Sequence, residues 1–184
     1  LTGVITGIIC VWLNSREHIA GWFFAIISCA LYIQIFYEAK IYGDMLLQVF
    51  FIIISVYGWY NWQFGAREKV QLPVSLMPNA YYLGLILLIV LATFSFGYYL
   101  DTYTDSPIPY VDASTNAVSL AAQWMMARKY LENWLVWIGV DIVYVGLFIN
   151  RELYLTTILY GIFLLIATLG YFQWLRSYRK TIPV

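Results

Sequence analysis

The sequence is dominated by long apolar stretches that are separated by short polar segments. Seven such stretches span roughly residues 1–14, 19–37, 44–64, 79–100, 113–128, 133–149 and 153–175. A helix needs about 20 apolar residues to cross the hydrocarbon core of a bilayer. The chain is 62% hydrophobic and 11% charged, against about 45–50% and 25% in soluble domains. The pattern predicts an all-α membrane protein with seven transmembrane helices.

The first and fifth stretches are short for a membrane crossing. Because the chain begins at Leu1 and not at Met, we expect that part of the natural protein precedes the first stretch. Loops 67–78 and 101–112 are the longest connections. The prolines are all predicted to lie outside the helices, at Pro73, Pro78, Pro107, Pro109 and Pro183.

The basic residues favour one orientation in the membrane. Eight of them lie at one side of the predicted spans: Arg16, Arg67, Lys69, Arg128, Lys129, Arg176, Arg179 and Lys180. The other side carries only Lys40 and Arg151, together with Asp101, Asp105 and Asp112. The positive-inside rule predicts a cytoplasmic C-terminus and a first residue on the outer side. Net charge is zero, so a nucleic-acid-binding surface is not expected.

An internal repeat relates the two ends of the chain. Residues 1–62 align without a gap with residues 113–174, a shift of 112 positions, and the alignment pairs identical Trp, Tyr, Gly and Arg residues, among them Trp22/Trp134, Tyr32/Tyr144, Gly58/Gly170 and Trp62/Trp174. Four crossings separate the copies, so the two copies run parallel. We therefore predict a three-helix repeat over 1–64, a linker with the fourth helix over 65–112, a second repeat over 113–176 and a cytoplasmic tail over 177–184.

The sixth stretch contains an acidic residue near its middle. Asp141 costs about 2.5–3.5 kcal/mol to insert there, and such a residue by default marks a functional site. Trp134, Trp137 and Asp141 lie at i, i+3 and i+7 on one helix face. Two indoles and a carboxylate suit a flat cationic ligand. Asp141 could instead be protonated and bonded to a neighbour, or carry protons.

Other polar side chains inside the spans are candidates for the same site. Asn116, Ser119 and Gln123 share one face of the fifth helix, and the further candidates are Gln48, Gln34, Asn61, Trp59 and Tyr160. Each could equally hold helices together by hydrogen bonds. Asp44 is interpreted as a helix cap, and Trp22, Trp62 and Trp174 as residues of the membrane-interface aromatic belt.

Enzymatic signatures are missing from the sequence. His18 is the single histidine, Cys10 and Cys29 lie in apolar spans, and no G-x-S-x-G, H-E-x-x-H or phosphate-binding P-loop motif occurs. We expect no enzyme activity, no metal and no cofactor.

Four segments resemble the PnuC family of vitamin transporters. Trp134-x-x-Trp137-x-x-x-Asp141 matches a W-x-x-W-x-x-x-N/D signature, and YGD (42–44), SVYGWYNW (55–62) and TNAVSLAAQWMMARKYLENW (115–134) are also similar to that family. The resemblance covers nearly the whole chain. It implies a three-plus-one-plus-three fold like that of SWEET transporters, a bacterial inner-membrane location and a homotrimer. It also implies facilitated diffusion of nicotinamide riboside, which a cytoplasmic ribosylnicotinamide kinase traps by phosphorylation.

Relatives in that family carry thiamine or riboflavin, so the substrate is open between related vitamins. Nicotinamide riboside and thiamine are both cationic aromatics, whereas riboflavin is neutral and larger and fits Asp141 less well. The rival mechanisms are proton-coupled uptake through Asp141 and a membrane module that does not transport.

Overall fold

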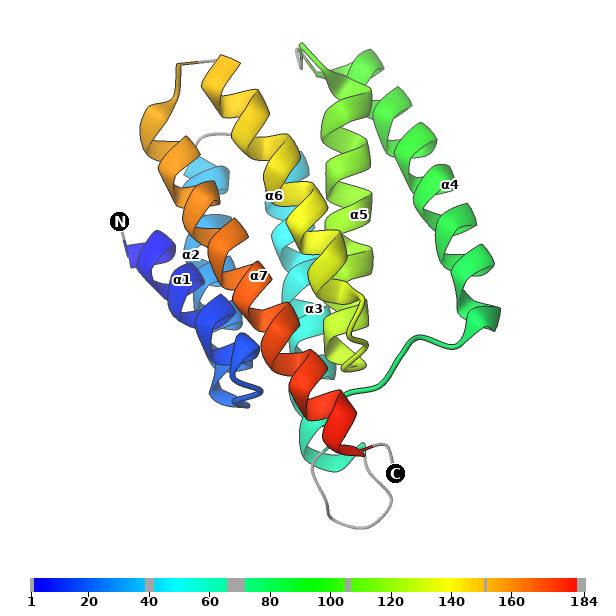
Figure 1. Ribbon diagram of the computed structural model, residues 1–184. Coiled ribbons are helices and arrows are strands. Elements are labelled where there is room, and N and C mark those ends of the chain that lie inside the picture. Colours follow the sequence, from blue (N-terminus) through cyan, green and yellow to red (C-terminus); the bar gives the residue numbers. More distant parts are fainter. Residues whose placement is uncertain (1, 39–41, 66–71, 105–106, 151, 182–184) are drawn as a thin grey trace.

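The computed structural model describes residues 2–38, 42–65, 72–104, 107–150 and 152–181. These residues form seven helices and no strand, which confirms the all-helical prediction. The helices are α1 (Thr2–Ser15), α2 (Ala20–Glu38), α3 (Tyr42–Phe64), α4 (Asn79–Tyr103), α5 (Pro109–Ala127), α6 (Asn133–Asn150) and α7 (Tyr154–Thr181). They run alternately up and down the molecule, and the two termini lie towards opposite ends (Figure 1).

Two helix boundaries differ from the sequence prediction. Pro109 lies in the first turn of α5, so the expectation that every proline lies outside the helices is wrong here. The first turn tolerates proline because its N–H would have no intrahelical partner. Helix α7 continues to Thr181, beyond the predicted end at 175, because a helix need not stop where its hydropathy falls.

Five helices in the described part of the chain are long and apolar enough to cross a membrane: α2, α3, α4, α6 and α7. Helix α1 is apolar but has only 14 residues, and α5, with 19 residues, is not among the five. Large apolar side chains remain exposed on the outer surface, for example Leu83, Leu87 and Leu91 of α4. A soluble protein rarely exposes such a continuous apolar face, and the chain is a multi-pass integral membrane protein.

Six of the helices form a closed ring. Each helix in the order α1, α2, α3, α5, α6, α7 packs against the next, and α7 packs against α1. Helix α4 contacts α5 and, within the described residues, no other helix. It lies at the edge of the molecule in Figure 1. The ring therefore brings the two ends of the sequence together and leaves α4 outside.

Four tryptophans close one end of this ring. Trp22, Trp62, Trp134 and Trp174 are at most 3% exposed. Ring centroids lie 5.2 Å apart for Trp22–Trp62, 5.8 Å for Trp62–Trp174 and 5.4 Å for Trp134–Trp174. The belt interpretation of Trp22, Trp62 and Trp174 is wrong, because these side chains point into the bundle and not towards lipid headgroups. We call these four residues the tryptophan cluster.

Two glycines make room for the indoles. A Cβ atom at Gly58 would lie 2.6 Å from the ring of Trp22, and one at Gly170 would lie 2.9 Å from the ring of Trp134. Any larger side chain at either position would therefore displace a fully buried indole.

Hydrogen bonds and an ion pair join the helices at the same end. The indole of Trp174 donates to the carbonyl of Asn14 at 3.1 Å, and that of Trp62 donates to the carbonyl of Met126 at 3.2 Å. Lys129 Nζ lies 3.0 Å from Glu17 Oε2 and is almost fully buried. These contacts tie α7 to α1 and α3 to α5, so this end of the ring is firmly closed.

Candidate functional site

The helix ring encloses a cavity of about 420 Å³. All six ring helices contribute to its wall, and no described residue of α4 does. Small-molecule sites usually have volumes of about 300–1,000 Å³. The cavity is thus large enough for a ligand of vitamin size, and it lies where the two ends of the sequence meet.

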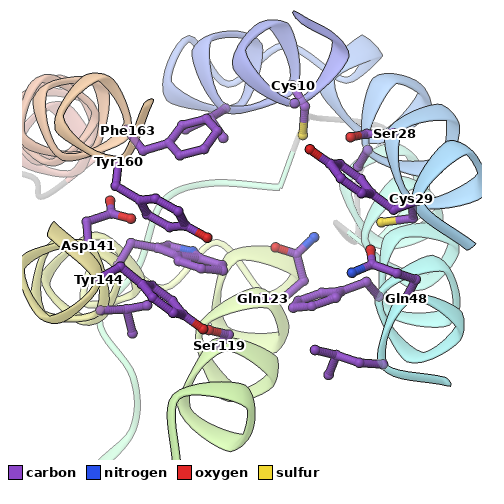
Figure 2. A pocket seen from close by; sticks show the side chains of 18 of the residues that line it. Cys10, Ser28, Cys29, Gln48, Ser119, Gln123, Asp141, Tyr144, Tyr160 and Phe163 are labelled. Carbon is purple, nitrogen blue, oxygen red and sulfur yellow. The ribbon is translucent and has the colours of Figure 1, made fainter. Parts of the chain in front are cut away.

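Seven of the ten site residues predicted from the sequence line this cavity. They come from four helices: Gln48 from α3, Asn116 and Gln123 from α5, Trp134, Trp137 and Asp141 from α6, and Tyr160 from α7. Figure 2 shows Gln48, Gln123, Asp141 and Tyr160 around one open space. The helical spacing on α5 and α6 therefore identified the faces that look inward.

Gln34, Asn61 and Trp59 lie elsewhere. Gln34 Nε2 donates to Glu38 Oε1 at 3.2 Å on the exposed side of α2. Asn61 Nδ2 donates to the carbonyl of Ala127 at 2.9 Å and joins α3 to the end of α5. Trp59 packs edge-on against Phe23 of α2, with ring centroids 6.0 Å apart. Asn61 therefore holds two helices together by a hydrogen bond, which is the alternative that the sequence left open.

The face of α6 that carries Trp134, Trp137 and Asp141 combines close packing with polar groups that line the cavity. Trp134 is fully buried and packs edge-on against Trp174, so it belongs to the tryptophan cluster as well as to the cavity wall. Trp137 lies one turn further along, and its indole Nε1 has no hydrogen-bond partner in the described structure. Asp141 is 4% exposed. This face of α6 thus offers the indole N–H of Trp137 and the carboxylate of Asp141 to a ligand.

An aromatic wall continues from Asp141 towards the far end of the cavity. Tyr144 and Tyr160 have ring centroids 4.7 Å apart, and Tyr160 and Phe163 lie 5.9 Å apart. Figure 2 shows Asp141, Tyr144, Tyr160 and Phe163 on the same side. A planar ligand could stack on this wall.

Amide and hydroxyl groups lie on the wall formed by α3 and α5. Gln123 Nε2 lies 3.4 Å from Ser55 Oγ, a long hydrogen bond. Ser119 and Gln48 also line the cavity (Figure 2). A weakly bonded amide can exchange its partner for a ligand hydroxyl or carboxamide at small cost.

Sequence reasoning missed several cavity residues. Asn14 is buried at the closed end, where its Nδ2 contacts Cys10 Sγ at 3.5 Å and Met126 Sδ at 3.4 Å. Asp44 lies in the first turn of α3 and lines the cavity, so the interpretation of this residue as only a helix cap is wrong. Both residues stand near helix ends, where a polar side chain gives no sign that it faces inward.

Comparison with known proteins assigns the chain to a family. Residues 1–176 match the model of the family described as nicotinamide mononucleotide transporter. The chain belongs to this family of membrane transporters. It is 28% identical to the nicotinamide riboside transporter PnuC of Escherichia coli (strain K12), over 97% of this chain and 85% of that protein. PnuC of Neisseria mucosa is also 28% identical, over 96% of this chain and 71% of that protein. The resemblance to PnuC proteins is thereby confirmed.

Two further comparisons bear on fold and substrate. The riboflavin/roseoflavin transporter RibM of Streptomyces davaonensis is 26% identical over 100% of this chain and 88% of its own length. The crystal structure of a vitamin B3 transporter PnuC has a TM-score of 0.76 and 24% identity, covering 98% of this chain and 82% of the other. This likeness supports the helical fold. Because the relatives are named transporters, the prediction that this PnuC-family chain is not an enzyme is confirmed.

Proposed function

We propose that the chain carries nicotinamide riboside across the membrane by facilitated diffusion. One observation carries this proposal: Trp137 and Asp141 line a single cavity in which the described lining residues include no Lys, Arg or His. Nicotinamide riboside is a flat pyridinium cation with a carboxamide and a ribose. Indole faces attract a desolvated aromatic cation by up to about 2 kcal/mol, and Asp141 balances its charge. Relatives of the chain bear the name of this substrate.

The remaining polar groups suit the rest of the ligand. Asn116, Ser119 and Gln123 offer amides and a hydroxyl from α5, and Gln48 faces them from α3. These groups can bond the carboxamide and the ribose hydroxyls, which a purely aromatic cavity would leave without partners.

The proposed mechanism is alternating access of two three-helix repeats, over 1–64 and 113–176, joined by the linker 65–112. Pairs of contacts 112 residues apart support this division. Trp22 packs on Gly58 as Trp134 packs on Gly170, and Tyr32 stacks on Phe36 as Tyr144 stacks on Phe148, both at 5.8 Å. The closed end of the cavity, at the tryptophan cluster, would open by movement of one repeat against the other.

The proposed orientation places the tryptophan cluster towards the cytoplasm of a bacterium. Helices α1, α5 and α7 run in the same direction (Figure 1). Arg16 follows the end of α1, and Arg128 and Lys129 follow the end of α5, so these basic residues lie at the same side as the end of α7. The cytoplasmic side of a membrane protein is the basic one. Lys40, Arg67, Lys69, Arg151 and Asp105 lie outside the described residues. In this orientation the end of α7 faces the cytoplasm and the start of α1 faces outward, while residues 1 and 182–184 lie outside the described residues.

The proposal includes two further parts. A cytoplasmic ribosylnicotinamide kinase captures the substrate, and the chain assembles into a homotrimer. Both come from the family resemblance. Facilitated diffusion alone cannot concentrate a solute, so a chemical step that converts the substrate inside the cell would give uptake its direction.

The decisive test is calorimetric titration of the purified protein in detergent with nicotinamide riboside, thiamine and riboflavin in parallel. Tight binding of the riboside alone supports the proposal. Tight binding of thiamine would keep the mechanism and change the substrate. Riboflavin is the second candidate because RibM matches the whole chain, and tight riboflavin binding would show that the carboxylate does not select for charge.

Proton coupling is tested separately in liposomes. Facilitated diffusion predicts uptake that follows the substrate gradient alone. Uptake that follows an imposed pH gradient, and loses this dependence in Asp141→Asn, would refute simple diffusion.

A further inference from the structure

The cavity contains a second carboxylate besides that of Asp141. Asp44 lies in the first turn of α3, is partly buried and lines the cavity. Gln48 is one turn further along the same helix face, and its amide lies at the open space in Figure 2. Asp44 and Asp141 therefore face one cavity from α3 and α6, two helices that are not neighbours in the ring.

Neither carboxylate is neutralised by the part of the protein that the structure describes. Asp44 and Asp141 have no hydrogen bond or ion pair there, and the described cavity wall has no basic side chain. Lys129, at the closed end, is paired with Glu17 and does not line the cavity.

Further acidic charge lies close to Asp44. Asp44 and Asp112 repel each other, and the side chain of Tyr144 interacts electrostatically with Asp44, Asp112 and Asp141. The described wall of this cavity carries two carboxylates and no basic side chain, and an acidic side chain without a basic partner favours binding of an opposite charge.

We propose that Asp44 is a specificity-determining residue that, together with Asp141, selects a cationic ligand over a neutral one of the same shape. The assignment rests on the proposed function, because it concerns the pyridinium charge of nicotinamide riboside. Asp44 acts on the charge and not on the stacking face, which the indoles and tyrosines supply. It also stands nearer than Asp141 to the end of the ring where α3 begins, so an entering cation meets it first.

The alternative is a purely structural role, since an acidic side chain in the first turn also stabilises its helix. The two roles differ in what they do to a neutral ligand. A structural defect weakens binding of every ligand, whereas loss of a charge contact weakens binding of the cation only.

The experiment uses nicotinamide riboside and its 1,4-dihydro form, which has the same substituents but an uncharged ring. Dissociation constants for both are measured by calorimetry on the full chain, purified in detergent, for the wild type, D44N and D44E. Asp101, an exposed acid at the end of α4 outside the described cavity wall, provides the matched control D101N.

We expect D44N to weaken binding of the cation on the order of 10-fold, which corresponds to about 1.4 kcal/mol. Binding of the dihydro form should stay within about 2-fold, which also shows that the variant is folded. D44E should restore most of the preference for the cation, and D101N should bind both forms like the wild type.

Equal weakening of both forms in D44N, or no change for either, overturns the assignment while the proposed function stands. A wild type that binds neither form refutes the proposed function, and the assignment with it.

Discussion

The ion pair between Glu17 and Lys129 is the contact whose removal should be most costly at the closed end of the ring. Lys129 is 1% exposed, its Nζ lies 3.0 Å from Glu17 Oε2, and it stands 4.6 Å from the ring centre of Trp62. Both residues adopt positive φ, 57° at Glu17 and 54° at Lys129. The pair joins the turn after α1 to the turn after α5, which are 112 residues apart.

Glu17→Gln leaves the buried ammonium with a neutral amide. Removing one partner of a buried pair costs about 3–5 kcal/mol. The Glu17 side chain is 21% exposed, so water screens part of the interaction, and the indole of Trp62 still stabilises the cation. We therefore expect a loss of about 2 kcal/mol, or roughly 4–8 °C in Tm for a chain of this length.

The assay is thermal unfolding in detergent, followed by tryptophan fluorescence, for E17Q, K129Q and E17Q/K129Q. The double-mutant cycle isolates the pair energy. Glu152 is the matched control because it also has positive φ, 58°, and is exposed in a turn without an ion pair in the described structure. E152Q should change stability by less than about 0.5 kcal/mol. An E17Q variant as stable as E152Q, or a coupling energy near zero, would refute this reasoning.

Three further predictions concern the cavity and its packing. Trp137→Ala should weaken nicotinamide riboside binding by roughly 1–3 kcal/mol in calorimetry, whereas Trp12→Ala, on the exposed side of α1, should not; equal effects would remove Trp137 from the site. Gly58→Ala should lower stability by about 1–3 kcal/mol through overpacking, while Gly161→Ala, where a Cβ meets nothing within 4 Å, should be neutral or slightly stabilising in the same unfolding assay. Gln34→Ala should leave the affinity for nicotinamide riboside unchanged, because the Gln34 amide forms its hydrogen bond on the exposed side of α2. Weaker binding in this variant would contradict the placement of Gln34 outside the cavity.

Hydropathy predicted the seven helices without tertiary information, because a long apolar stretch in a membrane protein is helical, and five of the described helices are long and apolar enough to cross a membrane. It could not predict which side of a helix faces the bundle. Trp22 and Trp174 lie near span ends, where indoles also occupy the membrane interface. Only the ring arrangement, which pairs α1 with α7 and α3 with α5, shows that these side chains point inward and pack together.

The candidate site was predictable where polar residues repeat along one helix face. Asn116, Gln123 and Asp141 each stand in an apolar surrounding, so helical spacing was enough to orient them. Asn61 lies near the end of α3, away from the face of Gln48 and Ser55, and donates to the carbonyl of Ala127 at the end of α5. Spacing identifies a face, and only the neighbouring helix decides whether that face meets a cavity or another backbone.

The proposed repeat also explains how a two-fold scaffold can bind an asymmetric ligand. Packing positions related by 112 residues are identical, as with Gly58 and Gly170. Some cavity positions related in the same way are also identical, as with Tyr32 and Tyr144, but others differ: Ala25 corresponds to Trp137, and Cys29 corresponds to Asp141. A symmetric cavity would offer a pyridinium two equivalent positions and would lack a distinct place for its ribose. We propose that this divergence places the indole of Trp137 and the carboxylate of Asp141 on the wall of one repeat only, so that the ligand would bind in one orientation.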